Sequence, residues 1–244
     1  MRALPRTRHE ARRPFFYRHV LRSRPTGALR PAAEFPRYAP AEWRADAAVH
    51  ALGLTLALVG CAALAALTPP GADRLRLVGL VPYAVGLLAM LGCSALYNLT
   101  PEGARKRLFR RLDHAAIFLM IAGTYTPFTL VKIAGTWGTG LLAFVWTVAG
   151  TGIAVELLGL GRHDRLSVAA YLLLGWSVLA VLGPLSAAVS PAGLALLVAG
   201  GVLYSAGVAF HLWTRLPYHN VVWHGFVLAA AACHYAAVLR AVAA

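Results

Sequence analysis

The sequence from Ser94 to Phe128, SALYNLTPEGARKRLFRRLDHAAIFLMIAGTYTPF, joins the end of one long apolar segment to the start of the next. The connection between the two segments is short and strongly basic, and Asp113 and His114 stand where the second segment begins. An acid at the edge of a hydrocarbon layer is costly unless it is hydrogen-bonded, paired or bound to a metal. The stretch therefore predicts a membrane-spanning fold with a polar site at one end.

The composition is typical of integral membrane proteins. Hydrophobic residues make up 59% of the chain and charged residues only 13%, which is too little charge to cover a soluble domain. The three cysteines stand apart inside apolar segments and predict no disulfide framework. The net charge of +14 is concentrated in residues 1–44, which hold eleven arginines against three glutamates. In so apolar a chain this charge favours topology signals and anionic lipid head groups over nucleic acid as a partner.

The apolar residues form seven blocks, each near the ~20 residues that a helix needs to cross a bilayer. Their predicted limits are about 46–67, 75–99, 112–132, 138–160, 166–187, 192–213 and 218–241. The blocks lack the period-of-two alternation of barrel strands, so helices must satisfy the backbone in lipid. The predicted fold is an all-α bundle of seven transmembrane helices, with neighbouring spans antiparallel because the connections are short.

Loop charges predict the orientation. Basic residues gather in residues 1–44 and in the turns 100–111, 161–165 and 214–217, which share one side of the membrane. The positive-inside rule puts that side, and the N-terminus, in the cytoplasm and the C-terminus outside. We interpret residues 1–44 as a disordered basic arm and residues 45–244 as the membrane domain of a multi-pass plasma-membrane protein. An arginine-rich, acid-poor start also fits an organelle transit peptide, and this alternative stays open.

Most polar side chains of the spans lie at the predicted cytoplasmic ends. They are Glu42, Asp46 and His50 at the first span, Ser94 and Asn98 at the second, Asp113 and His114 at the third, His211 at the sixth, and His219, Asn220 and His224 at the seventh. Taken singly, Asp46 and Asp113 suit helix N-termini, and a histidine near a span end is normally satisfied by a neighbour. Their gathering at one depth predicts a site, since buried ionisable groups in membranes usually mark one.

Imidazoles and carboxylates in one layer are typical zinc ligands. Zinc lowers the pKa of a bound water to about 7, so a zinc site near the inner leaflet predicts cleavage of a lipid amide or ester. In this interpretation Asp113 or Asp46 handles protons and Ser94 assists nearby.

Two further polar residues have plainer interpretations. Glu156 is expected to pair locally with Arg162 or His163 near the end of the fourth span. His234 stands about 15 Å deeper than His224 by helix rise, so we expect a hydrogen-bonded core histidine there.

Three blocks of the sequence resemble the hemolysin III family. They are SALYN at 94–98, RLDHAAIFLMIAGTYTPF at 111–128 and RLPYHNVVWHGFVLAAAACHYAAV at 215–238. The stripe formed by Glu42, Asp46 and His50 also matches that family's first span, and the likeness covers roughly residues 41–241. The resemblance implies kinship with the progestin and adipoQ receptors and the alkaline ceramidases, a superfamily of membrane hydrolases.

The resemblance also implies a zinc ion bound by three histidines. One belongs to an SxxxH motif ending the second span and two to an HxxxH motif opening the seventh, with the aspartate of the third span near the bound water. Ser94 and His224 keep these motifs, but Asn98 and Asn220 stand at two histidine positions. Because an amide carbonyl is a poor zinc ligand beside imidazole, we expect a weakened or lost zinc site, or a rewired one. The rewired ligands would come from His219, His211, His224, Asp113 and His50.

Three functions are weighed at this point, and a transporter also stays conceivable, although the polar groups form a layer at one face and no continuous path, which argues against it. The chain is expected to act in membrane lipid homeostasis, as a zinc-dependent lipid hydrolase with a weakened metal site or as a non-enzymatic sensor or structural protein. A pore-forming cytolysin is the least favoured, because a seven-span protein is poorly placed to attack another cell. The sequence leaves the substrate and the oligomeric state open.

Overall fold

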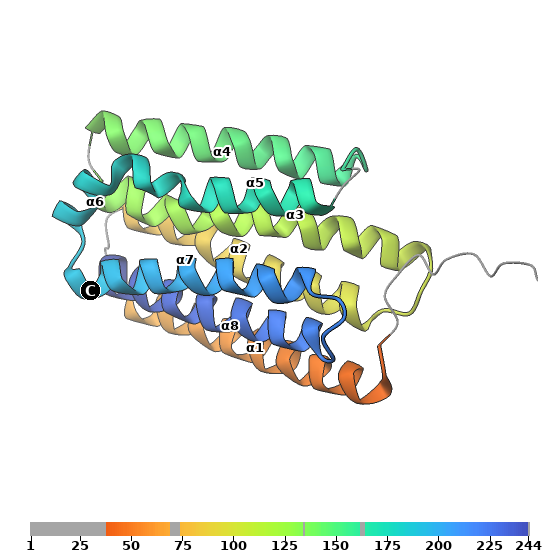
Figure 1. Ribbon diagram of the computed structural model, residues 1–244. Helices are drawn as coiled ribbons and strands as arrows, with labels where there is room; N and C mark the ends of the chain where they lie inside the picture. Colours follow the sequence, from red (N-terminus) through yellow and green to blue (C-terminus); the bar gives the residue numbers. More distant parts are fainter. Residues whose placement is uncertain (1–37, 69–73, 134, 162–163, 244) are drawn as a thin grey trace, which may run out of the picture. The chain divides into compact units, whose positions relative to one another are not determined.

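The structure, a computed structural model, describes residues 38–68, 74–133, 135–161 and 164–243 (Figure 1). Over these residues the chain is helical and contains no strand. Seven helical segments are long and apolar enough to cross a membrane, which confirms the predicted all-α bundle. Residues 1–37 of the predicted arm lie outside the described residues. The cytoplasmic placement of the N-terminus stays a prediction.

The elements follow one another with short connections. In chain order they are α1 (Pro40–Leu67), α2 (Arg74–Leu99), α3 (Ala104–Pro127) with a π-helical turn (Phe128–Lys132), α4 (Gly135–Leu157), α5 (Asp164–Trp176) with a 3₁₀ turn (Ser177–Val181), α6 (Leu182–Ala188), α7 (Pro191–Leu212) and α8 (His219–Val238) with a π-helical turn (Leu239–Ala243). The fifth span is composite, because α5, the 3₁₀ turn and α6 together cross the apolar layer as one segment, Asp164–Ala188.

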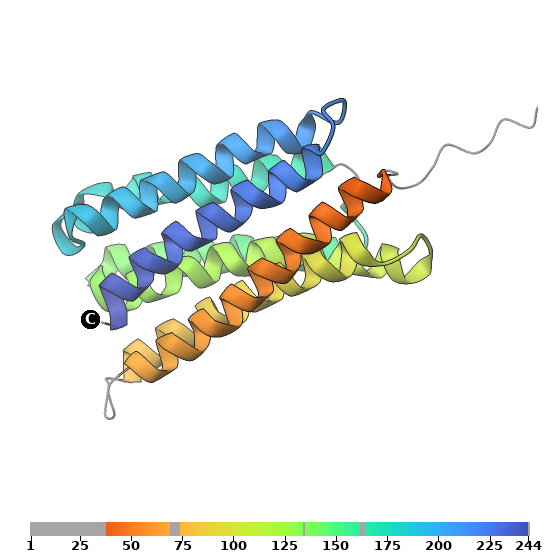
Figure 2. The same cartoon turned by 90° about the horizontal axis from the view of Figure 1, so that it is seen from below.

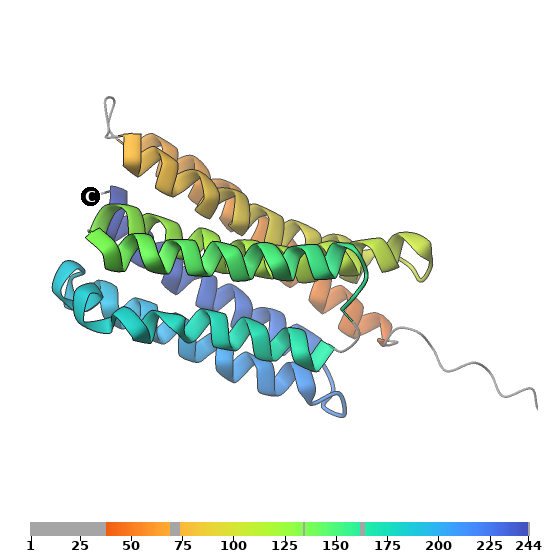
Figure 3. The ribbon, with the colours of Figure 1, turned by 90° about the horizontal axis from the view of Figure 1, so that it is seen from above.

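Successive spans run in opposite directions, as the short connections predicted (Figure 1). Helix α3 packs between α2 and α4, and α8 packs between α1 and α7. Figure 2 shows α1 and α8 side by side at the end where both helices begin. Seen from the opposite side, α4 lies over α3 and α5 lies over α7 (Figure 3). The end of the bundle where α1, α3, α5 and α8 begin therefore collects the polar side chains that the sequence analysis singled out.

Two spans begin more than one helical turn before their hydrophobic blocks. Helix α1 begins at Pro40 because proline suits the first helical position and the Glu42 carboxylate accepts the Ala39 N–H at 2.9 Å. Helix α3 begins at Ala104, so most of the basic 100–111 connection is helical, as expected of a run rich in alanine, arginine, lysine and leucine. Hydropathy alone cannot show such amphiphilic first turns.

The fifth span is interrupted in its middle. Pro184 lacks an N–H and cannot bond the Ala180 carbonyl, which favours a break one turn earlier, where the 3₁₀ turn lies. The Tyr125 hydroxyl of α3 bridges the break, since it donates to the Gly175 carbonyl at 2.7 Å and accepts the Val178 N–H at 2.8 Å. Backbone groups freed in the apolar layer are thus satisfied by a neighbouring helix.

Helices α2 and α3 pack in direct backbone contact. A Cβ atom added at Gly86 would lie 2.9 Å from the Met120 Cα, and one added at Gly123 would lie 2.5 Å from the Pro82 carbonyl oxygen. Small residues permit this approach in membranes, where packing rather than water drives helix association. The contact holds Ser94 of α2 and Asp113 of α3 at one level.

The substitution Gly123→Ala is expected to destabilise the bundle, because the new methyl group forces α2 and α3 apart. Overpacking of this kind costs about 1–3 kcal/mol, which thermal unfolding in detergent would show as a lowered midpoint. Gly150→Ala in α4 is the matched control, since a Cβ there meets nothing within 4 Å. Equal unfolding midpoints for the two variants would contradict the packing argument.

Candidate functional site

The first turns of α1 face α8 along a stripe of three acidic and imidazole side chains. Glu42, Asp46 and His50 recur every four residues and so share one face of the helix. Glu42 accepts the backbone N–H of Tyr218 at 2.8 Å, at a residue in the left-handed conformation just before α8. This bond fixes the start of α1 against the start of α8, and the next two turns of the stripe then meet α8 directly.

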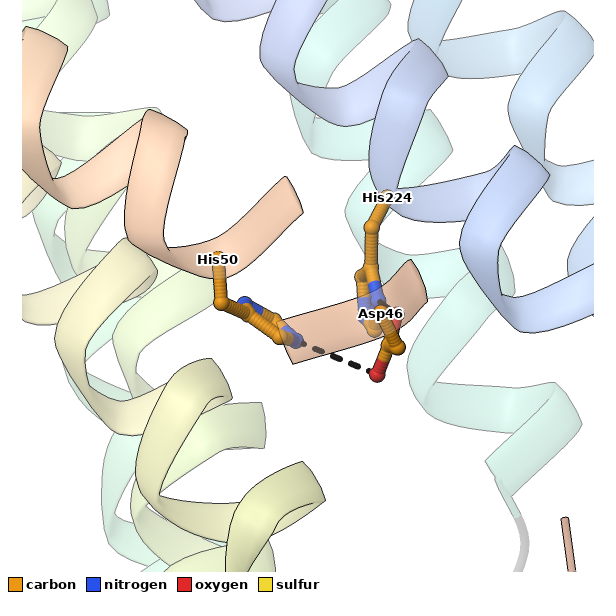
Figure 4. Close-up of side chains that lie close together, drawn as sticks. All are labelled: Asp46, His50 and His224. Carbon is orange, nitrogen blue, oxygen red and sulfur yellow. Dashed lines mark hydrogen bonds and ion pairs between the residues drawn. The ribbon is translucent and has the colours of Figure 1, made fainter. Parts of the chain in front are cut away.

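Asp46 is the centre of the polar contacts. Its Oδ1 accepts the Nδ1–H of His224 at 2.6 Å, and its Oδ2 accepts the side-chain amide of Asn220 at 3.2 Å. The Nε2 of His50 lies 3.4 Å from the same Oδ2. Figure 4 shows the ring of His50 directed at the carboxylate of Asp46, with His224 close beside it. All four side chains are buried, so the carboxylate sits in the bundle with three polar neighbours and little contact with solvent.

The network continues from α8 into α2. The amide of Asn220 also donates to the Asn98 Oδ1 at 3.1 Å, and the amide of Asn98 donates to the Ser94 carbonyl at 3.0 Å. Both asparagines therefore act as hydrogen-bonding bridges between α1, α8 and α2. Of the two amides that the resemblance places at histidine positions, Asn220 therefore binds Asp46 directly, and Asn98 ties Asn220 to α2.

Asp46, His50 and His224 form a group that fits a divalent metal ion. Each offers one ligand atom, and these atoms lie within 4.8 Å of one another. Two imidazoles and a carboxylate are a donor set that zinc accepts, with a fourth position left for water or substrate. The buried Nε2 of His50 makes no hydrogen bond within the described part of the chain. Buried polar atoms are normally partnered. The lack of a partner at this nitrogen therefore favours a bound metal ion as its partner.

A cavity of about 250 Å³ opens beside this group. The side chains at its polar end are His50, Ser94, Asp113, His114, His211 and His224. Ser94 hydrogen-bonds the carboxylate of Asp113, so α2 and α3 contribute a second acid to the cavity wall. Away from this end the lining is mostly apolar and reaches Phe128, Leu141 and Leu185. The cavity therefore runs from the acid–histidine layer into the apolar interior of the bundle.

The structure brings some of the predicted metal residues together and leaves two apart. His211 lines the cavity and packs against Trp223, with ring centroids 5.2 Å apart. His219 packs against Tyr38 at 5.9 Å, about 100° around α8 from Asn220. Neither histidine belongs to the three-residue metal group found among the described residues. Asp46, which the sequence analysis assigned to proton handling, lies within that group.

One pair of polar residues was missed by the sequence analysis. His114 Nδ1 lies 3.6 Å from Glu156 Oε2, which joins α3 to α4. The pairing of Glu156 proposed from the sequence involved Arg162 or His163, which lie outside the described residues. The available signal was that Glu156 is the only acid in the fourth span. The expectation for His234 is confirmed, since its Nε2 lies 3.2 Å from the Leu197 carbonyl.

Fold and site together define a multi-pass membrane protein with a buried aspartate–histidine group at one end of seven spans. Residues 44–235 match the family model described as Haemolysin-III related. The chain is 35% identical over 195 residues to the hemolysin-3 homolog of Bacillus subtilis (strain 168), covering 80% of this chain and 92% of the relative. It therefore belongs to the haemolysin III family.

Two further similarities extend the comparison. Hemolysin-3 of Bacillus cereus is 35% identical over 195 residues, covering 80% of this chain and 89% of the relative. The monocyte to macrophage differentiation factor of Homo sapiens is 27% identical over 209 residues, covering 84% of this chain and 87% of the relative. No solved structure matches the chain significantly.

Proposed function

We propose that this protein acts in membrane lipid homeostasis as a zinc-dependent hydrolase of a lipid amide or ester, in the plasma membrane. The observation that carries the proposal is the cavity, whose polar end holds His50, Asp113 and His224 and whose remaining wall is mostly apolar. A pocket with this division suits a molecule with an acyl chain and a carbonyl-bearing head. Membrane lipids are accordingly the proposed partners, and nucleic acid is not.

Asp46, His50 and His224 would hold the metal ion. Bound zinc would supply Lewis acidity toward a carbonyl oxygen and would make nearby water more acidic. Asn98 and Asn220 hold Asp46 by the amide bridge between α2 and α8. Outer contacts of this kind orient a ligand and preserve its geometry.

The other cavity residues would act on the substrate itself. Asp113, held by the hydroxyl of Ser94, is placed to accept a proton from water at the cavity wall. The apolar walls take the acyl chain and exclude bulk water, so the polar groups act in a low dielectric. With the predicted orientation, the polar end faces the inner leaflet.

The test is hydrolysis by the purified full-length protein with zinc supplied. Fatty acid released from N-acyl and O-acyl lipids would be measured by mass spectrometry for the wild type and for Asp113→Asn. Loss of a general base costs about 10²–10⁴-fold in rate, so Asp113→Asn should be nearly inactive. Glu102→Gln, in the exposed connection between α2 and α3, should keep full activity. A wild type that releases no fatty acid from either lipid class would contradict the proposal.

A second candidate is a non-enzymatic role for the polar layer. It is favoured by the Asn220 amide, which joins Asp46 to Asn98 and completes a hydrogen-bonded network without a metal. Satisfied polar networks of this kind tie helices together in membranes. The hydrolysis assay separates the two, because a purely structural network predicts no turnover and an unfolding temperature that zinc removal leaves unchanged.

A further inference from the structure

The cavity wall also holds His114 of α3, whose ring is paired with Glu156 of α4. His114 lines the cavity next to Asp113, and its Nδ1 lies 3.6 Å from Glu156 Oε2. Glu156 is buried within the fourth span, where an ionisable group is costly unless it is paired or used. Neither residue belongs to the metal group or to the amide network described above.

Helix α5 holds this pair in place. The Ser167 hydroxyl of α5 donates to Glu156 Oε1 at 2.5 Å, so the carboxylate keeps one oxygen for His114. The Tyr171 hydroxyl donates to the backbone carbonyl of His114 at 3.0 Å. The α4–α5 connection covers the carboxylate closely, because a Cβ at Gly161 would lie 2.9 Å from Glu156 Oε2. The carboxylate is therefore fixed against movement and shielded on that side.

The orientation of the ring has a chemical consequence. A carboxylate beside Nδ1 selects the tautomer that carries its proton there, which leaves Nε2 as the basic nitrogen. The 3.6 Å separation is in ion-pair range rather than hydrogen-bond range, and such contacts tighten when the imidazole takes up a second proton. His114 thus has a fixed negative partner on one side and a cavity on the other.

We propose that His114 is a proton-transfer residue of the cavity and that Glu156 is its positioning residue, an inference that rests on the proposed hydrolase function. Water adds to the lipid carbonyl carbon, and the proton that Asp113 accepts from this water passes on to His114 Nε2. The same proton passes to the leaving nitrogen or oxygen as its bond to the carbonyl carbon breaks. The products are a fatty acid and an amine or alcohol, and His114 returns to its starting form.

Several charged or titratable groups surround His114. They are Asp113 on its own helix, Glu156 on α4, Asp164 on α5, His211 on α7, and His50 and His224 across the cavity. Asp164 forms an ion pair with Arg110, so its negative charge is neutralised. The variants below therefore change His114 and Glu156 without touching the metal group.

The kinetic experiment uses the full-length protein with zinc supplied and a fluorogenic N-acyl lipid as the probe. His114→Gln should lower kcat by about 10²-fold or more, with KM and zinc content near wild-type values, and should remove one limb of the pH–rate profile. Glu156→Gln should lower kcat less, and Glu156→Asp should restore part of the loss. Thr151→Val, on the exposed face of α4, is the matched control and should behave as wild type.

A second readout needs neither turnover nor zinc. In ¹⁵N-histidine NMR spectra of the full-length protein in lipid nanodiscs, the resonances lost in His114→Gln identify that ring. They should show the Nδ1-protonated tautomer in the wild type and a changed tautomer balance in Glu156→Gln.

The outcomes separate this inference from the proposed function. A wild type that cleaves the probe while His114→Gln cleaves it equally well overturns the role of His114 and leaves the hydrolase standing. A wild type that cleaves neither N-acyl nor O-acyl lipids overturns both. Loss of zinc in His114→Gln would make this histidine a ligand and refute the proton-transfer role. A tautomer balance of His114 that is the same in the wild type and in Glu156→Gln would refute the positioning role.

Discussion

The substitution His224→Ala is expected to lower the zinc content of the purified protein from about one ion per chain to near zero. His224 is the only member of the metal group that α8 contributes, and its ring contacts both other members. It donates to Asp46 at 2.6 Å and lies 4.4 Å from the His50 ring centroid to centroid. Three protein ligands are the minimum usual for zinc, so removal of one leaves a pair with weak affinity. Elemental analysis after detergent purification measures the effect.

The matched variants test which histidines bind the metal. His50→Ala should lose zinc as His224→Ala does, because His50 supplies one of the three ligand atoms that lie within 4.8 Å of one another. His211→Ala and His219→Ala should keep zinc, since both lie outside the metal group. If these two variants lose zinc while His50→Ala keeps it, a rewired site on α7 and α8 replaces the one inferred from the geometry.

The double substitution Asn98→His with Asn220→His is expected to raise zinc retention against a chelator by at least about tenfold, since imidazole binds zinc far better than an amide carbonyl does. The two amides lie 3.1 Å apart, and Asn220 lies 3.2 Å from Asp46. Two new imidazoles would therefore enter the layer that already holds Asp46 and His224. The change removes the amide bridge from α2 to α8, so thermal unfolding should be measured beside zinc retention.

The control for that experiment is Asn98→Gln with Asn220→Gln. Glutamine keeps the amide chemistry but lengthens both side chains, so it disturbs the bridge without adding a zinc ligand. Zinc retention should not rise in this variant. If the histidine variant gains no zinc and the wild type already holds a full complement, the amide positions do not limit metal binding. The weakened-site interpretation would then be wrong.

Hydrophobic block lengths predicted the fold because the bilayer imposes one solution on such a chain. A segment of about 20 apolar residues has to satisfy its own backbone in lipid, and only a helix does so within one segment. The number of spans and their antiparallel order followed directly. The helical start of α3 at Ala104 did not, since charged helical turns outside the lipid have the same hydropathy as a loop.

The layer of polar residues could also be predicted, because membrane depth follows from position along a helix. Asp46, Asn98, Asn220 and His224 were placed at one level from their positions near span ends, and the structure joins them by hydrogen bonds. Position along a helix does not show which neighbouring helix a side chain faces. His219 and Asn220 are neighbours in sequence, yet only Asn220 reaches Asp46.

The sequence by itself determined the membrane fold, the family and the depth of the polar layer, because these depend on hydropathy, motif spacing and helix rise. Only the tertiary structure decided which side chains meet, because contacts across helices depend on the rotation of each helix and on its packing partners. It brought His50 to Asp46 and His224, left His211 and His219 outside that group, and paired His114 with Glu156 across α3 and α4. Those pairings arise from the close approach of α1 to α8 and of α3 to α4, which no single helix encodes.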